Sequence, residues 1–243
     1  MTASLEALYA AMEGTWPAKR AFREGPWMLR EGDGGGKRVS AATAEGPVGP
    51  EDIAMAEQAM EAIGQPPLFM LRAGDEALDA ALAERGYEII DPVTIYSIAP
   101  AGLTDIPIPR VTVFDLWEPL AIMREIWAQG GVGPARLRVM ERAKGPKTAL
   151  LSRLDDKPAG VAFAAMHDGT AMVHAVEVLP HQRRKGAAAW MMRGAAFWAQ
   201  RQGAHTLSVI CVDANAGANA LYRSLGFSVQ GHYHYRHKPK EAS

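Results

Sequence analysis

Residues 178–188 read VLPHQRRKGAA, and this stretch decides the fold. The apolar run before it predicts a strand over about 170–179, and Pro180 marks its end because proline cannot donate to a sheet ladder. The apolar run after it predicts a long helix from about Ala187 to Gln202. The segment is therefore a strand, a tight loop and a helix N-terminus.

This arrangement is suited to binding an anion. The first turn of a helix offers unpaired backbone N–H groups and the positive end of the helix dipole. Gly186 and Ala188 are small enough to let phosphate groups approach the backbone, and Arg183, Arg184 and Lys185 add positive charge. A solvated helix start is the alternative, but cations there oppose the dipole, which favours an anionic ligand such as a pyrophosphate.

A second stretch, residues 215–227, reads NAGANALYRSLGF. Together, V-x-P-x-x-R-x-x-G-x-A at 178–188 and this stretch resemble the two acyl-CoA motifs of the GNAT superfamily of N-acetyltransferases. The resemblance implies an α/β (α+β) fold: a mixed, mostly antiparallel central sheet flanked by helices, the acyl-CoA N-acyltransferase fold. It also implies acetyl-CoA as co-substrate, with no metal.

The resemblance further implies which residues bind and react. Acetyl-CoA would lie between the strand at Val176–Val178 and a splayed neighbour at Leu207–Val212, with the thioester near Val176. An amine would attack the thioester directly, and Tyr222 would protonate the leaving thiolate, since a phenol of pKa about 10 can donate to it. The implied acyl-CoA contacts are Val176, Val178, Arg183, Arg184, Lys185, Gly186, Ala187, Ala188, Asn215 and Ala218.

The base that takes the amine's proton is harder to assign. Strand alternation puts His174 on the same face as Val176 and Val178, with Glu177 on the other face. His174 can titrate near neutrality and is the candidate base, although a lone histidine in a strand is more often structural. Glu177 could equally be a surface or inter-domain residue.

The chain also contains an internal repeat. PLFMLRAGD at 67–75 precedes a helix ending at Gly86-Tyr87, and LSVICVD at 207–213 precedes one ending at Gly226-Phe227, at a constant offset of 140. Upstream, 27–42 and 149–164 both predict two strands joined by a turn, at an offset of 122. The first half is therefore 140 − 122 = 18 residues shorter between this hairpin and the next strand. The missing residues correspond to the phosphate loop, and Leu82 stands where the repeat would place Tyr222.

We therefore expect a degenerate GNAT-like domain over residues 1–100, a linker over 101–109 and a catalytic domain over 110–243. The catalytic half begins with a strand at 110–114 and helices at 116–129 and 136–144. Strands at about 147–154, 159–167 and 170–179 follow.

Composition narrows the functions. A net charge of −1 gives no reason to expect nucleic acid as a general partner, and the single cysteine, Cys211, forms no intrachain disulfide. The longest apolar stretch is too short to span a bilayer, so we expect a cytoplasmic protein without a membrane segment. His232 and His234 share a strand face, but no ligand cluster accompanies them and we expect no metal site.

The acceptor is an amine on a small molecule or peptide that the sequence does not identify, and the oligomeric state is equally open. Two alternatives remain: a non-catalytic acyl-CoA-binding sensor, which needs the loop but no acid, and an interaction scaffold with both halves degenerate.

Overall fold

The computed structural model describes residues 3–239, which divide into two compact units. Unit 1 comprises residues up to Pro17, Ile95–Cys211 and Ala216–Gln230, and unit 2 comprises Ala18–Thr94, Val212–Asn215 and residues from Gly231. The units are therefore not consecutive segments, unlike the expected domains 1–100 and 110–243. None of the helices within residues 3–239 is long and apolar enough to cross a membrane.

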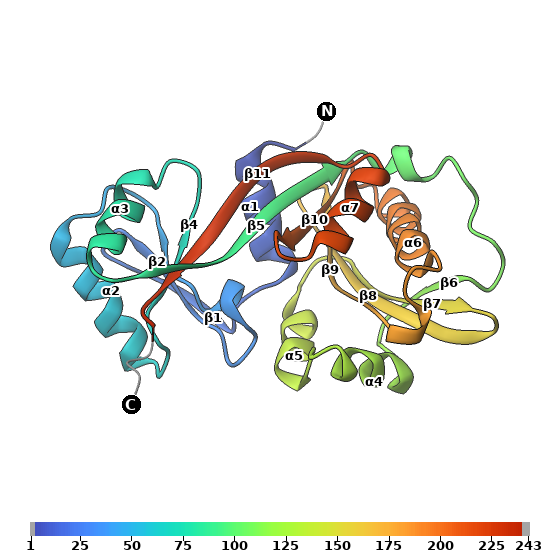
Figure 1. Cartoon of the computed structure of the whole chain (residues 1–243), viewed down its shortest axis with the longest axis horizontal. Helices are drawn as coiled ribbons and strands as arrows, with labels where there is room; N and C mark the ends of the chain where they lie inside the picture. Colours follow the sequence, from blue (N-terminus) through green and yellow to red (C-terminus); the bar gives the residue numbers. More distant parts are fainter. Residues whose placement is uncertain (1–2, 240–243) are drawn as a thin grey trace. The chain divides into compact units, whose positions relative to one another are not determined.

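Unit 1 is built on a mixed sheet with the strand order β11-β5-β10-β9-β8-β7-β6. The pairs β6/β7, β7/β8 and β8/β9 are antiparallel, and β9/β10 is parallel. The expected mostly antiparallel sheet flanked by helices is confirmed (Figure 1). Its elements are α1 (Leu5–Thr15), part of β5 (Glu88–Ile98), η2 (Pro100–Leu103), β6 (Val113–Leu116), α4 (Ala121–Gln129), α5 (Pro134–Arg142), β7 (Lys147–Leu154), β8 (Lys157–His167), β9 (Thr170–Val178), η3 (Pro180–Gln182), α6 (Ala187–Arg201), β10 (Thr206–Val212), α7 (Ala216–Ser224) and the start of β11 (Ser228–His237).

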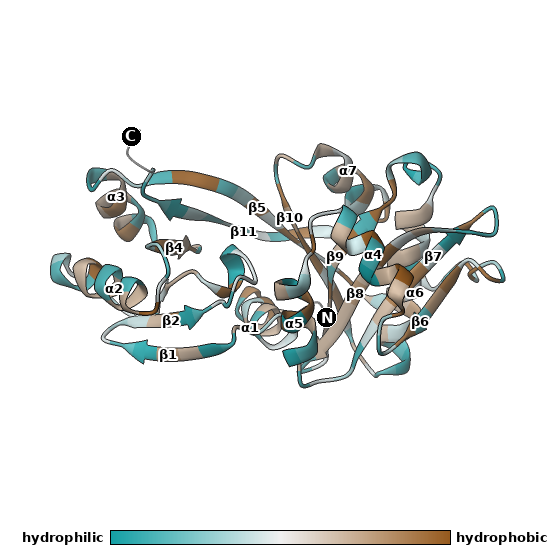
Figure 2. Ribbon diagram, turned by 90° about the horizontal axis from the view of Figure 1, so that it is seen from below, coloured by the Kyte–Doolittle hydropathy of each residue, from teal (hydrophilic) through white to brown (hydrophobic). Residues whose placement is uncertain are grey.

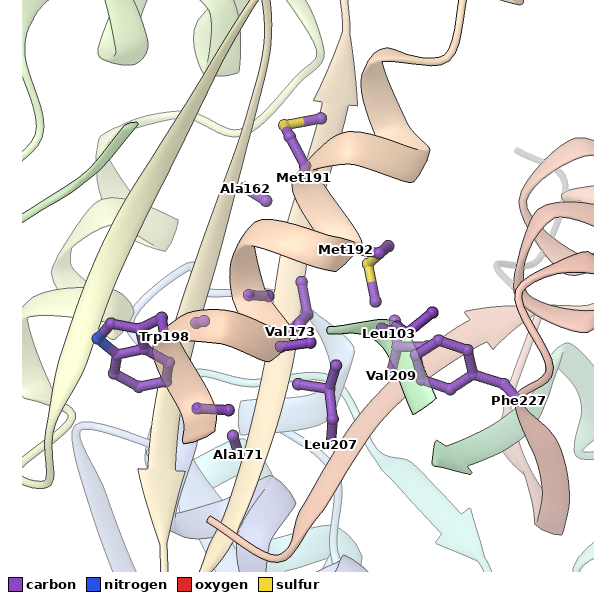
Figure 3. Close-up of a cluster of buried hydrophobic side chains, with 14 of the residues drawn as sticks. Leu103, Ala162, Ala171, Val173, Met191, Met192, Trp198, Leu207, Val209 and Phe227 are labelled. Carbon is purple, nitrogen blue, oxygen red and sulfur yellow. The ribbon is translucent and has the colours of Figure 1, made fainter. Parts of the chain in front are cut away.

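One face of this sheet packs against α6. Figure 3 shows Met191, Met192 and Trp198 of α6 among apolar residues of β8, β9 and β10. These side chains are almost fully buried, and burying one such side chain contributes about 1.5–3 kcal/mol.

The opposite face is covered by α1 and α4, which both contact β8 and β9. Neighbouring strand residues point to opposite faces. Ala162, Ala164 and Val173 pack toward α6, whereas Phe163 and His174 contact Trp16 just after α1. The helix α1 is thus part of the sheet packing of unit 1.

The bounds expected for the strand and helix that follow residue 109 were wrong. The strand expected at 110–114 lies at Val113–Leu116, and the helix expected from Leu116 begins only at Ala121. The segment expected to be a linker begins with a 3₁₀ turn whose Leu103 is buried in the α6 core, and Arg193 donates to the Leu103 carbonyl at 2.9 Å.

Unit 2 contains a three-stranded antiparallel sheet, β1-β2-β3, and the strand order β4-β11-β5. In its core, Phe69 lies tilted against Trp27 and edge-on to Tyr87, with ring centroids 5.2 and 5.3 Å apart. Figure 2 shows apolar and hydrophilic residues mixed along α2, as a half-buried helix requires. Its elements are β1 (Arg20–Glu24), β2 (Trp27–Glu31), η1 (Lys37–Val39), β3 (Thr43–Ala44), α2 (Pro50–Ala62), β4 (Leu68–Leu71), α3 (Glu76–Glu84) and parts of β5 and β11.

The expected hairpin at 27–42 was wrong. Trp27–Glu31 pairs with the preceding strand, Arg20–Glu24, and residues 37–39 form a 3₁₀ turn instead of a strand. The glycine-rich run before this turn includes Gly34 and Gly36 with positive φ, so the chain turns away there rather than continuing in a ladder.

The offset of 140 is visible in the element boundaries. Both ends of α3 lie 140 positions before those of α7, and β5 begins 140 positions before β11. Equivalent hydrogen bonds tie helix to strand in each unit. Tyr96 Oη donates to Asn219 in unit 1, and the Arg236 guanidinium donates to Asp79 in unit 2, again at positions 140 apart.

Candidate functional site

Strand β9 leaves β10 before it ends. Their parallel register runs from Thr206–Thr170 to Val209–Val173 and goes no further. Val176–Val178 therefore has an edge that β10 does not pair, as the expected splay requires. Leu207–Val209 was also expected to separate, but these residues stay paired, and only the last part of β10 diverges.

A β-bulge interrupts β9 at Ala175. The register against β8 shifts between Val161 and Phe163, and Ala175 has a φ of +49°. A bulge inserts one extra residue and reverses the alternation beyond it. The expected alternation was therefore wrong: Val173, Val176 and Val178 all pack toward α6, and His174 lies on the opposite face.

His174 is enclosed beneath α1. Its side chain is buried, its Nε2 lies 2.8 Å from Thr15 Oγ1, and its ring lies against Trp16 and Phe163. Thr15 Oγ1 donates its one proton to the Ala11 carbonyl at 2.5 Å, so it accepts from His174 Nε2–H. This nitrogen is a hydrogen-bond donor to the helix, which is the setting of a structural histidine.

Glu177 lies on the same face as His174, where α4 ends. The side chain is half-buried and makes no hydrogen bond of 3.5 Å or less within residues 3–239. Burial raises the pKa of Glu177, although the guanidiniums of Arg183 and Arg136 oppose the shift. Gly130 approaches so closely that a methyl group there would lie 2.5 Å from Glu177 Oε2. This carboxylate is poorly solvated and able to accept a proton.

The loop after β9 delivers its basic residues to the N-terminus of α6. Arg183 donates from Nε to the Val178 carbonyl at 3.1 Å, and Lys185 donates to Gln182. Arg184 and Gly186 have left-handed φ values of 62° and 89°, which makes the sharp turn. Arg183 to Gly186 are exposed, while Ala187 is buried and Ala188 half-buried. No side chain caps the first turn of α6, so its N–H groups are not satisfied by a capping side chain.

The corresponding helix of unit 2 has the opposite character. Pro50 opens α2 and has no N–H, and Glu51 and Asp52 place negative charge in its first turn. The Asp52 carboxylate accepts from Gly49 N at 2.7 Å. This N-terminus is already capped by an anion, so it does not offer the phosphate site that α6 offers.

Tyr222 faces the core of unit 1 from α7. It is 4% exposed, and its ring lies 5.7 Å from that of Tyr96 and 5.9 Å from that of Phe227. Burial, with smaller effects from Cys211 and Tyr96, raises the pKa of Tyr222 above its usual value, so the phenol stays protonated. Ala218 is half-buried one turn earlier on α7, and Asn215 is exposed just before the helix.

Two residues of the candidate site were not identified from the sequence. Trp127 on α4 donates from Nε1 to the Ala175 carbonyl at 2.8 Å. Tyr96 enters unit 1 on β5, from the half expected to be a separate domain. Within residues 3–239 no group of three or more His, Cys, Asp or Glu side chains could hold a metal ion.

Comparisons with known proteins agree with this geometry. Residues 116–227 match the model of the Acetyltransferase (GNAT) family. The "Uncharacterized N-acetyltransferase YobR" of Bacillus subtilis (strain 168) is 26% identical over 243 residues, covering 96% of this chain and 97% of that protein.

Two solved structures share the fold. A GCN5-related N-acetyltransferase from Kribbella flavida has a TM-score of 0.65 at 23% identity, covering 96% of this chain and 95% of that chain. A tandem GNAT protein from the clavulanic acid biosynthesis pathway has a TM-score of 0.63 at 13% identity, covering 89% and 78%. Residues 116–227 are therefore an acetyltransferase domain of the GNAT family, which agrees with the expected enzyme class, the acyltransferases.

Proposed function

We propose that this protein transfers an acetyl group from acetyl-CoA to an amine on a small molecule or peptide, at one site per chain. One observation carries the proposal. The unpaired end of β9 leads directly into a basic loop and an uncapped helix N-terminus, so one strand edge and one anion site follow each other in the chain. Acyl-CoA has a matching shape, with a pantetheine arm attached to a pyrophosphate.

In this proposal the backbone of Val176 and Val178 pairs with the pantetheine arm. The N–H groups of Gly186, Ala187 and Ala188 bind the pyrophosphate, with Arg183, Arg184 and Lys185 around it. Asn215 and Ala218 would line the other side, as the family motif implies. The acidic N-terminus of α2 supports the restriction to one site, since it would repel a second pyrophosphate.

The amine nitrogen attacks the thioester carbon, a C–N bond forms, and the C–S bond breaks. We assign the amine's proton to Glu177 rather than to His174, because His174 Nε2 is already engaged by Thr15. Tyr222 donates to the departing sulfur. Because its pKa is raised, full transfer to a thiolate of lower pKa is uphill, so its main contribution is a hydrogen bond that stabilises the leaving charge.

The test is acetyl-CoA consumption by the purified protein with a broad amine panel, measured as thiol release and as acetylated product by mass. The proposal predicts amine-dependent release that falls by about tenfold or more in Glu177→Gln. Tight CoA binding with no turnover on any amine would favour a non-catalytic sensor instead. Failure to bind CoA at all would leave only the scaffold alternative.

A further inference from the structure

The bulge in β9 is an unfavourable backbone conformation that contacts with neighbouring elements must stabilise. Ala175 has a left-handed φ of +49°, which is unfavourable for a residue with a Cβ atom. Such residues persist where the surrounding structure fixes them, and they concentrate at functional sites. The bulge lies one residue before Val176, so it determines which way the N–H and C=O groups of the unpaired strand edge point.

The first support comes from α4. Trp127 is fully buried, and its Nε1–H donates to the Ala175 carbonyl at 2.8 Å. An indole is a donor only, so this bond has one possible polarity. The carbonyl that the bulge turns out of the ladder is thereby satisfied by one side chain.

The second support comes from α1 and acts on the preceding residue. Ala11 O, Thr15 Oγ1 and His174 Nε2 form a chain of two hydrogen bonds at 2.5 and 2.8 Å. Thr15 is fully buried and His174 is 4% exposed. Because the hydroxyl proton is used on Ala11, the direction of both bonds is fixed.

We propose that Thr15 and Trp127 are positioning residues for acyl transfer: acting through His174 and the Ala175 carbonyl, they hold the bulge so that the backbone of Val176 is aimed at the acyl group. The proposal rests on the proposed function. It gives α1 a role in the reaction, although its residues lie about 160 positions before β9 in the sequence. It also makes His174 part of a support rather than a base.

The experiment compares two site variants with two matched controls. Thr15→Val removes only the hydroxyl, and Trp127→Phe removes the N–H donor. Thr148→Val and Trp198→Phe remove the same groups from other buried positions of unit 1, on β7 and α6. We expect kcat to fall by about 10- to 100-fold in the site variants, as a displacement of about 1 Å does, and by less than about twofold in the controls. The dissociation constant for CoA is expected to change little in the two controls.

Two further measurements separate positioning from folding. Thr15→Ser restores the hydroxyl and is expected to restore at least half of the wild-type kcat. Hydrogen–deuterium exchange of the peptide spanning 170–180 is expected to speed up in both site variants at temperatures where they remain folded, and not in the controls. The proposal is overturned if site variants and controls lose melting temperature alike while kcat and exchange at 170–180 stay at wild-type values. A wild-type protein without turnover would instead refute the proposed function itself.

Discussion

Gly130→Ala is a sharp test of Glu177 because it moves the carboxylate without altering it. Gly130 has φ −83° and ψ 5°, a conformation that alanine adopts without strain. The added methyl would lie 2.5 Å from Glu177 Oε2 and 2.7 Å from Cγ. Because non-bonded heavy atoms rest at about 3.5–4.0 Å, the carboxyl group has to move by about 1 Å.

The size of the effect follows from that displacement. A misplacement of about 1 Å costs roughly 100-fold in rate, which corresponds to about 2.7 kcal/mol at about 1.36 kcal/mol per tenfold. We therefore expect kcat/KM for the amine to fall about 100-fold. The affinity for CoA is unchanged, since the α6 loop is untouched.

Gly133→Ala is the matched control, three residues further along the same turn. Gly133 has φ −85°, and a methyl group there meets nothing within 4 Å. It costs at most about 1 kcal/mol as a helix N-cap and is expected to keep turnover within about twofold. The assay is thiol release at amine concentrations below KM, where the rate reports kcat/KM. Wild-type turnover in Gly130→Ala, or an equal loss in Gly133→Ala, would refute Glu177 as the base.

Three further predictions concern titration and stability. Wild-type turnover rises with pH through a midpoint above the usual glutamate pKa, and Glu177→Gln abolishes this rise. Because burial raises the pKa of Glu177 in the folded state, the charged carboxylate destabilises the fold as pH rises through that pKa. Glu177→Gln therefore melts at a higher temperature than wild type at neutral pH but not in acid. Tyr222→Phe lowers kcat about tenfold or more, with calorimetric CoA binding preserved; unchanged kcat would remove Tyr222 from the mechanism. Asp79→Asn weakens the hydrogen bond to Arg236 and lowers the free energy of unfolding, measured in urea at neutral pH, by about 1.5–3 kcal/mol. Since Arg236 holds the pKa of Asp79 low, the difference between variant and wild type disappears as pH falls through that pKa. A difference that does not depend on pH would contradict the prediction.

Local sequence signals were sufficient wherever a segment's structure depends on its own residues. The strand expected at about 147–154 is β7 at Lys147–Leu154, and the helix expected from Ala187 begins there, because apolar periodicity and the Gly186 turn are local. The repeat register also held, since α3 and α7 match at both ends. These signals were enough to locate the basic loop before α6 and the helix that carries Tyr222.

The remaining features depend on contacts between distant segments. Nothing about Ala175 in the sequence indicates a left-handed residue, so the alternation of β9 was predicted without its bulge and His174 was placed on the wrong face. The domain boundaries depended on which sheet the first helix and β5 join, which their own periodicity does not encode. Tyr96 in particular reaches Asn219 across 123 positions.

The central claim, a single acyl-CoA site at the start of α6, is tested most directly by calorimetric titration of the full chain with CoA. We predict one CoA per chain, with affinity falling about tenfold or more, or about 1.4 kcal/mol, when Arg184 and Lys185 are both replaced by glutamine. The same replacement of exposed Lys144 and Lys157 is expected to leave affinity unchanged. Two CoA molecules per chain, no binding, or equal affinity in the two double variants would contradict the account.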